Sequence, residues 1–144
     1  MEIVHGREIK DATYAYVVDC KGEFPQKIPA ILANTPHLQA AENPKGTKLG
    51  AVYFDTSVTA KGKFGTFRIS SPAALFAEKK DGKLILTVTD ALMKKDLNSL
   101  TVYTSVPVRG EGVSKQSKNI YEIKIPLPAG AHCGQPATVT LELL

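Results

Sequence analysis

Histidine and cysteine are the residues of this 144-residue chain that would most readily carry nucleophilic chemistry. A Cys/His nucleophile needs the imidazole within hydrogen-bond reach of the thiol. The only neighbouring pair, His132 and Cys133, is adjacent in sequence, and an extended chain points adjacent side chains apart. The sequence therefore predicts a loop at a sheet edge here, and no nucleophilic pair.

The same residues are too scattered for a metal site. Metal centres need three or four convergent ligands, whereas His5, His37 and His132 show no H-x-H or H-x₃-H spacing. Cys20 and Cys133 form no C-x-x-C. These two cysteines either pair in an oxidising compartment or remain half-buried thiols, and both alternatives stay open.

Phosphate-binding and acid/base motifs are also missing. The segment Gly62 to Gly65, flanked by Lys61 and containing Lys63, lacks the helix that follows a phosphate loop, so a hairpin turn explains it better. Asp and Glu residues are dispersed, and no two of them form a recognisable pair for general acid/base catalysis. We expect no catalytic, cofactor-binding or metal-binding residue in this chain, and no cofactor.

Tyrosines are the remaining candidates for ligand contact. Exposed on a strand, a tyrosine makes a stacking platform for a sugar ring; buried, it packs in the core with its hydroxyl satisfied. We favour core packing for each of them. The five are Tyr14, Tyr16, Tyr53, Tyr103 and Tyr121, and all fall in expected strands.

The charge balance allows an anionic partner without specifying one. The net charge is +4 and the pI about 9.0. The lysines look scattered apart from pairs such as Lys79-Lys80 and Lys94-Lys95, and no arginine-rich block indicates nucleic acid. No stretch approaches the ~20 apolar residues of a membrane span. Met1 to Lys10 has no apolar signal-peptide region, so we expect either a cytosolic protein or a piece of a secreted one.

Alternation with period two dominates the chain and predicts strands. Its strongest instance flanks Asp81-Gly82, a dipeptide that suits a type I′ hairpin turn. We expect an all-β fold, an antiparallel β-sandwich of more than eight strands. Ala91 to Leu97 is a short helix or a turn, and Arg109 to Lys118 and Pro128 to Pro136 are loops. The expected strands are Thr13–Val18, Ile28–Ala33, His37–Glu42, Leu49–Asp55, Thr66–Ser70, Ala74–Lys79, Leu84–Thr89, Leu100–Val108, Asn119–Leu127 and Ala137–Leu143.

Five pieces of this chain occur in the order of a known family. They are His5-Gly6 with Ala12–Val17, Ile31–Thr35 with Leu38–Ala40, Gly50–Phe54, Ser71–Ala73 and Leu86–Asp90. Together they resemble the end of the central β-sandwich and the C-terminal domain of polysaccharide lyase family eight, which includes chondroitin and hyaluronan lyases. The resemblance covers roughly residues 3 to 90. It departs after Asp90, where Ala91-Leu92 replaces the Pro-Thr of many members.

The resemblance implies two units. Residues 1–25 would be the last strand of the central lyase sandwich plus a linker, and residues 26–144 the C-terminal β-sandwich domain. Such enzymes cleave glycosaminoglycans by β-elimination, with catalytic residues on an α/α toroid. None of the matched motifs is catalytic, so no catalytic residue is carried over. The implied partners are the toroid and central sandwich of the parent chain and an acidic polysaccharide, in the periplasm or outside the cell.

A rival interpretation comes from another class of protein. The chain could be a free-standing carbohydrate-binding or adhesion module with no enzyme attached. The reading frame upstream of Glu2 separates the two, because several hundred helix-rich residues there would support the lyase.

Overall fold

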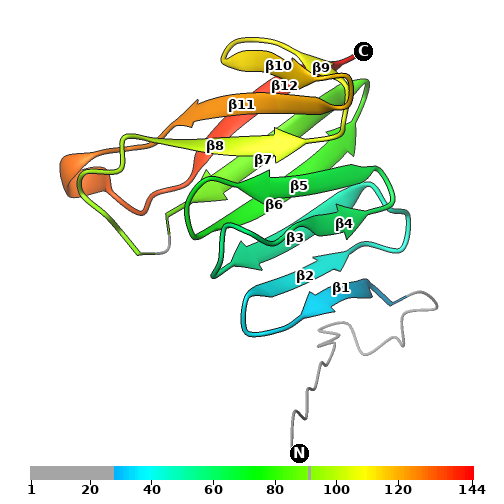
Figure 1. Ribbon diagram of the computed structural model, residues 1–144, viewed down its shortest axis with the longest axis horizontal. Coiled ribbons are helices and arrows are strands. Elements are labelled where there is room, and N and C mark those ends of the chain that lie inside the picture. Colours follow the sequence, from blue (N-terminus) through cyan, green and yellow to red (C-terminus); the bar gives the residue numbers. More distant parts are fainter. Residues whose placement is uncertain (1–27, 91) are drawn as a thin grey trace, which may run out of the picture.

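The computed structural model describes residues 28–90 and 92–144, which form two stacked antiparallel sheets (Figure 1). The larger sheet has seven strands in the order β1-β2-β3-β6-β7-β12-β9, and the smaller has five in the order β10-β11-β8-β5-β4. The expected all-β sandwich with more than eight strands is confirmed. The strands are β1 (Ala30–Asn34), β2 (Leu38–Glu42), β3 (Lys48–Tyr53), β4 (Ala60–Gly62), β5 (Gly65–Ile69), β6 (Ala73–Lys80), β7 (Lys83–Thr89), β8 (Ser99–Thr104), β9 (Val108–Arg109), β10 (Val113–Ser117), β11 (Ile120–Pro126) and β12 (Ala137–Leu143), with one 3-10 turn, η1 (Gly130–His132).

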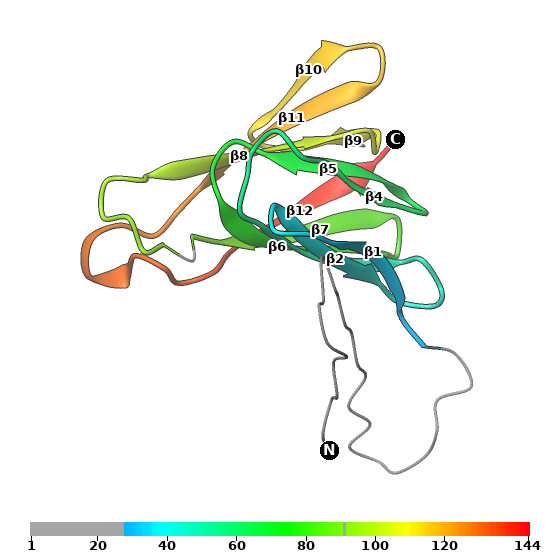
Figure 2. The same ribbon diagram turned by 60° about the horizontal axis from the view of Figure 1, so that its bottom comes forward.

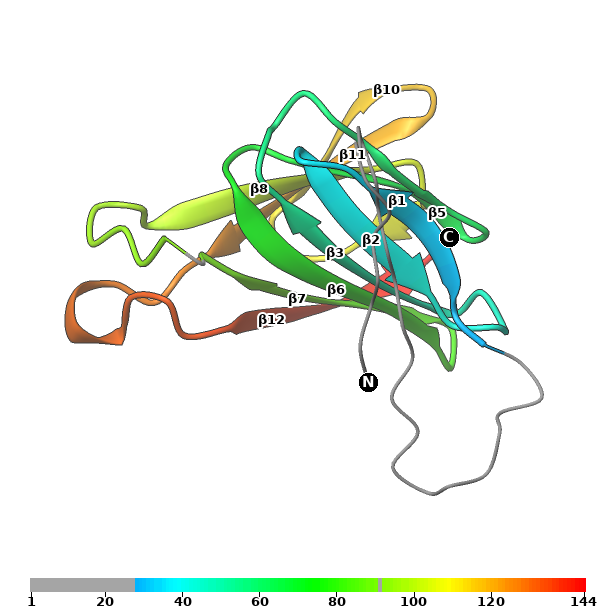
Figure 3. The ribbon, with the colours of Figure 1, turned by 90° about the horizontal axis from the view of Figure 1, so that it is seen from below.

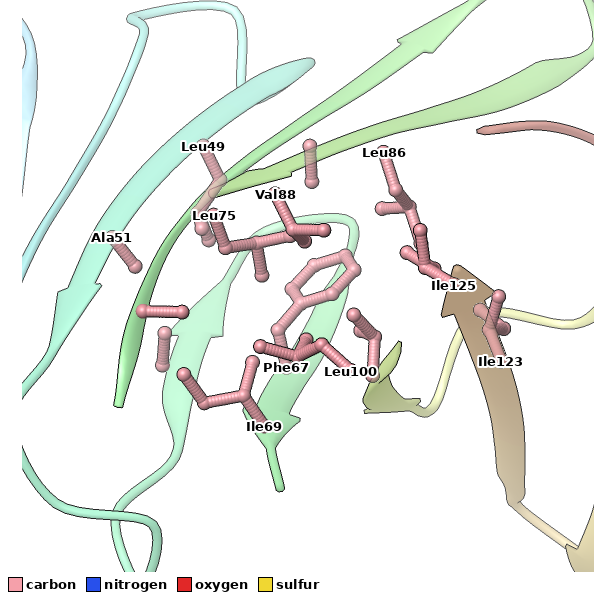
Figure 4. Packing of buried hydrophobic residues seen from close by; sticks show 14 of the residues in the cluster. Leu49, Ala51, Phe67, Ile69, Leu75, Leu86, Val88, Leu100, Ile123 and Ile125 are labelled. Carbon is pink, nitrogen blue, oxygen red and sulfur yellow. The ribbon is translucent and has the colours of Figure 1, made fainter. Parts of the chain in front are cut away.

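Period-two alternation places one face of each sheet in the core. In β7, Leu84, Leu86 and Val88 are fully buried while the residues between them are only partly covered. Side chains from both sheets meet there, with Phe67 of the smaller sheet among the leucines of the larger one (Figure 4). In Figure 2 the two sheets diverge toward the β10–β11 hairpin, and this hairpin extends beyond the larger sheet.

Two tight turns follow from their local sequence. Asp81 and Gly82 have φ of 50° and 72°, and they join the paired residues Lys80 and Lys83, as a type I′ turn requires. The β4–β5 hairpin also turns through two residues, between the paired Gly62 and Gly65. Both hairpin predictions are confirmed.

The end of the chain departs from expectation in two places. The single strand expected over 100–108 divides into β8, in the smaller sheet, and β9, in the larger sheet, so the chain changes sheets at residues 105–107. The polar loop expected over 109–118 contains β10, whose side chains are mostly exposed and therefore show no apolar alternation. Of the two alternatives for 91–97, a short helix or a turn, the described residues that follow Asp90 form turns.

Some expectations fall on residues that the structure does not describe. The strand expected at 13–18, the linker at 20–27 and the domain boundary near residue 25 all lie outside the described ranges. Within those ranges, no helix has the length and apolar character needed to cross a bilayer.

Tyr53 joins the two sheets through a hydrogen bond inside the core. Its side chain is 1% exposed, and its hydroxyl donates to the carbonyl oxygen of Phe67, on the opposite sheet, at 2.7 Å. Burial raises the pKa of this phenol well above its ordinary value of 10.0, and a hydrogen bond from the Ala60 backbone offsets only part of that shift.

We therefore predict that Tyr53→Phe lowers the free energy of unfolding by about 0.5–1.5 kcal/mol at neutral pH. The raised pKa also means that the folded protein keeps a proton that the unfolded chain loses above about pH 10. The stability that the protonated, buried Tyr53 contributes is fully present below that pH and is lost as the pH rises above it.

Urea unfolding at about pH 8 and about pH 11 measures both effects. The free energy of unfolding should decline less between the two pH values in Tyr53→Phe than in the unsubstituted chain. Tyr103→Phe is the control, because Tyr103 lies on the outer face of the smaller sheet, and it should decline like the unsubstituted chain.

Candidate functional site

His37 is the one predicted candidate that contacts a carboxylate in the described part of the chain. Its Nδ1 lies 3.6 Å from Oδ2 of Asp55; the side chain of His37 is 64% exposed and that of Asp55 is 40% exposed. The pKa of Asp55 is lowered, chiefly by the backbone N–H of Ser57, then by the Ser57 hydroxyl, and only slightly by His37. The pair is a surface contact beside the start of β2 and the end of β3, and the Ser57 hydroxyl donates to Oδ1 of Asp55 at 2.8 Å, so this hydroxyl contacts the carboxylate and not the imidazole.

His132 and Cys133 sit in and after η1, as the loop interpretation predicted. His132 is exposed and Cys133 is half-buried. Cys133 forms no disulfide with a described residue, and Cys20 and His5 lie outside the described ranges, so the pairing of the cysteines stays untested. Among residues 28–90 and 92–144, no group of His, Cys, Asp or Glu could hold a metal ion.

Two buried carboxylates were missed by the sequence reasoning, and both serve the backbone. Glu42 is 4% exposed, and its Oε2 accepts the Lys63 backbone N–H of the β4–β5 turn at 2.8 Å. Asp90, also 4% exposed, accepts the N–H of Leu92 at 3.0 Å and that of Lys94 at 2.7 Å. Because these oxygens are engaged in holding turns, neither carboxylate is placed for proton transfer.

The described tyrosines divide between core and surface. Tyr53 and Tyr121 are buried, as favoured from the sequence. Tyr103 faces outward from β8 and is half-buried, with the Arg68 guanidinium 4.2 Å from the centre of its ring. Tyr14 and Tyr16 lie outside the described residues.

The outer face of the larger sheet carries a group of apolar side chains beside the Lys48–Glu78 ion pair. In the ladder, Gly50 lies between Ala41 and Phe76, and Phe76 extends over the glycine, 4.0 Å from where a Cβ would stand. Phe76 is 42% exposed. No other strand among the described residues packs on this side (Figure 3). We call this surface the apolar face; its residues are Ile31, Ala41, Val52, Ala74, Phe76 and Ile85.

Comparison with known proteins identifies a family whose profile matches the chain and solved structures that share its fold. The sequence profile of the polysaccharide lyase family 8 C-terminal beta-sandwich domain matches residues 30–102, just over half of the chain. None of the curated protein sequences compared with the chain matches it.

Two solved structures of a chondroitin AC lyase from Streptomyces coelicolor A3 share this fold. The complex with chondroitin sulphate is 15% identical, with a TM-score of 0.60 over 81% of this chain. A tyrosine-to-alanine mutant of that lyase is also 15% identical, with a TM-score of 0.59 over 81% of this chain. In both cases the chain spans only 15% of the length of the lyase.

Asp90 is the last residue of the segment Leu86–Asp90, which resembles the lyase family, and its two hydrogen bonds to backbone N–H groups can be tested by mutation. Asp90→Ala should lower the free energy of unfolding by about 1–3 kcal/mol, because both N–H groups lose a charged acceptor. Asp90→Asn keeps one acceptor oxygen and should cost less. Asp96→Ala is the control, since Asp96 is an exposed residue of the same loop, and it should change stability by less than about 0.5 kcal/mol.

Urea unfolding of the three variants tests the role of Asp90. An Asp90→Ala chain as stable as the Asp96→Ala chain would show that these hydrogen bonds do not hold the turn.

Proposed function

The chain belongs to polysaccharide lyase family 8, as its C-terminal β-sandwich domain, and from this membership we propose that it is the non-catalytic part of a lyase that degrades glycosaminoglycans of the chondroitin sulfate or hyaluronan type. The observation that carries the proposal is the profile match over residues 30–102, supported by a fold shared with a chondroitin AC lyase. The proposed reaction is β-elimination next to a uronic acid.

The chemistry itself argues for a catalytic centre elsewhere in the parent chain. β-Elimination needs donors that neutralise the sugar carboxylate, a base for the C5 proton and an acid for the leaving oxygen. In the described residues, His37 and Asp55 are an exposed pair and the buried carboxylates of Glu42 and Asp90 hold backbone turns. The family resemblance assigns the catalytic groups to an α/α toroid, which we propose as a partner domain.

The apolar face supports packing against the rest of that lyase. Contiguous exposed apolar surface marks an interaction site, and the 144 residues correspond to 15% of the length of the lyases that share the fold. We propose that the neighbouring central sandwich of the parent chain covers this face and contacts its two exposed large side chains, Ile31 and Phe76. The proposed polysaccharide substrate supports a parent lyase that acts outside the cytoplasm, either in the periplasm or as a secreted enzyme.

The first prediction from this proposal concerns activity. The purified 144-residue chain should not cleave chondroitin sulfate or hyaluronan, because no acid/base set comes together among its residues 28–90 and 92–144. The unsaturated uronate product absorbs in the ultraviolet, so the absorbance of the mixture measures turnover directly. An active chondroitin lyase serves as the positive control, and a rise above the buffer blank with this chain would refute the non-catalytic role.

The second prediction concerns the apolar face. In the full-length lyase, Phe76→Lys should lower the unfolding temperature by several degrees, because an unpaired charge would be buried between domains. In the isolated chain the same substitution lies at the surface and should cost less than about 1 kcal/mol.

Ile120→Lys is the matched control, because Ile120 is 43% exposed, like Phe76, but belongs to the smaller sheet. Thermal unfolding of full-length and isolated chains gives the comparison. Equal losses in the two full-length variants would remove the argument for docking through the apolar face.

A further inference from the structure

One end of the sandwich gathers positive charge that is dispersed in the sequence. The turns β2–β3, β4–β5 and β6–β7 lie on the right-hand side of Figure 1, and each carries exposed lysines. We call this surface the lysine end; its residues are Lys45, Lys48, Lys61, Lys63, Lys79, Lys80 and Lys83.

Hydrogen bonds between the turns hold these lysines in one place. The backbone N–H of Lys63 donates to Glu42 at 2.8 Å, and its ammonium group donates to the carbonyl of Pro44 at 3.3 Å. The backbone N–H of Lys79 donates to the carbonyl of Thr47, in the β2–β3 turn, at 2.8 Å. The three turns are therefore fixed to one another, and the lysine end is a built surface with a defined arrangement of charge.

The lysine end holds one exposed carboxylate of its own, Asp81 in the β6–β7 turn, against seven lysines, and the other carboxylates near it have partners. Glu42 is buried against the β4–β5 turn. Glu78 pairs with Lys48 at 3.1 Å, and Glu142 pairs with Arg109 at 2.6 Å. None of the other six lysines of this end forms an ion pair with a carboxylate of the described residues.

The β6–β7 hairpin adds a direct repulsion between like charges. Lys80 and Lys83 occupy opposite positions in the ladder on either side of the turn at Asp81-Gly82, and both are exposed. Like charges directly opposite each other on neighbouring strands destabilise a sheet. A polyanion that contacts both ammonium groups would remove this repulsion, so the arrangement favours a bound anion.

We propose that the lysine end binds a segment of acidic polysaccharide, with its ammonium groups against the carboxylate and sulfate groups of the sugar chain. This inference rests on the proposed function, which supplies the acidic polysaccharide as the partner. Lysine ammonium groups are mobile point charges on long stems, so they suit repeated anionic groups on a flexible chain better than a single planar one. Binding here retains a long substrate on the enzyme and takes no part in the cleavage step.

The test is a titration of the 144-residue chain with chondroitin sulfate at low ionic strength, and separately with hyaluronan, which carries carboxylates alone. We expect binding that weakens as salt is raised. The variant Lys79→Gln/Lys80→Gln/Lys83→Gln should bind chondroitin sulfate at least about tenfold more weakly, because three charged contacts are lost. It should unfold at or above the temperature of the unsubstituted chain, because the repulsion between Lys80 and Lys83 is removed.

A variant of equal charge gives the control. Lys94→Gln/Lys95→Gln/Lys124→Gln removes three lysines that lie outside the lysine end, and its affinity should stay within about twofold. Equal losses in the two variants would show that only net charge matters and would overturn the proposal. So would the absence of binding by the unsubstituted chain, or tighter binding of duplex DNA than of chondroitin sulfate.

These outcomes are separate from those that test the proposed function. A chain that neither binds nor cleaves chondroitin sulfate overturns the lysine end as a binding site and leaves the non-catalytic role intact. A chain that cleaves it overturns the non-catalytic role, whichever lysines the glycan contacts.

Discussion

The contact between the inner faces of the two sheets is the interaction on which the rest of the structure depends. Each sheet has one face of alternating apolar residues, and neither face can be buried except against the other. The hydrogen bond from Tyr53 to the carbonyl of Phe67 restricts how the two sheets can pack, because a buried donor that loses its acceptor costs free energy. Hydrophobic burial brings the sheets together, and this hydrogen bond selects how β3 lies over β5.

That packing leaves two outer surfaces of opposite character. The larger sheet presents the apolar face around Phe76, and the turns at one end present the lysine end. An apolar surface favours a protein neighbour and a basic one favours a polyanion, so the two surfaces suit different partners at the same time. In the proposed lyase, one domain can therefore pack against its parent chain while it holds substrate.

The buried carboxylates show why burial alone does not identify a catalytic group. Glu42 and Asp90 have the low exposure that often accompanies acid/base residues, but their oxygens accept backbone N–H groups of turns. Glu42 does this across 21 residues of sequence, and so ties the β4–β5 turn of the smaller sheet to β2 of the larger one. Their role is to make the turns rigid, including the one that carries Lys63.

By itself the sequence determined most of the strands, the hairpin at Asp81-Gly82 and the all-β class, because alternation and turn chemistry act between residues close in the chain. It did not reveal β10, whose exposed side chains lack alternation, or the change of sheets between β8 and β9. The lysine end was equally hidden, since its lysines span residues 45–83 and look scattered when read in order. Only the tertiary structure brings them together, because the order and register of strands decide which turns meet, and both are set by burial between distant segments.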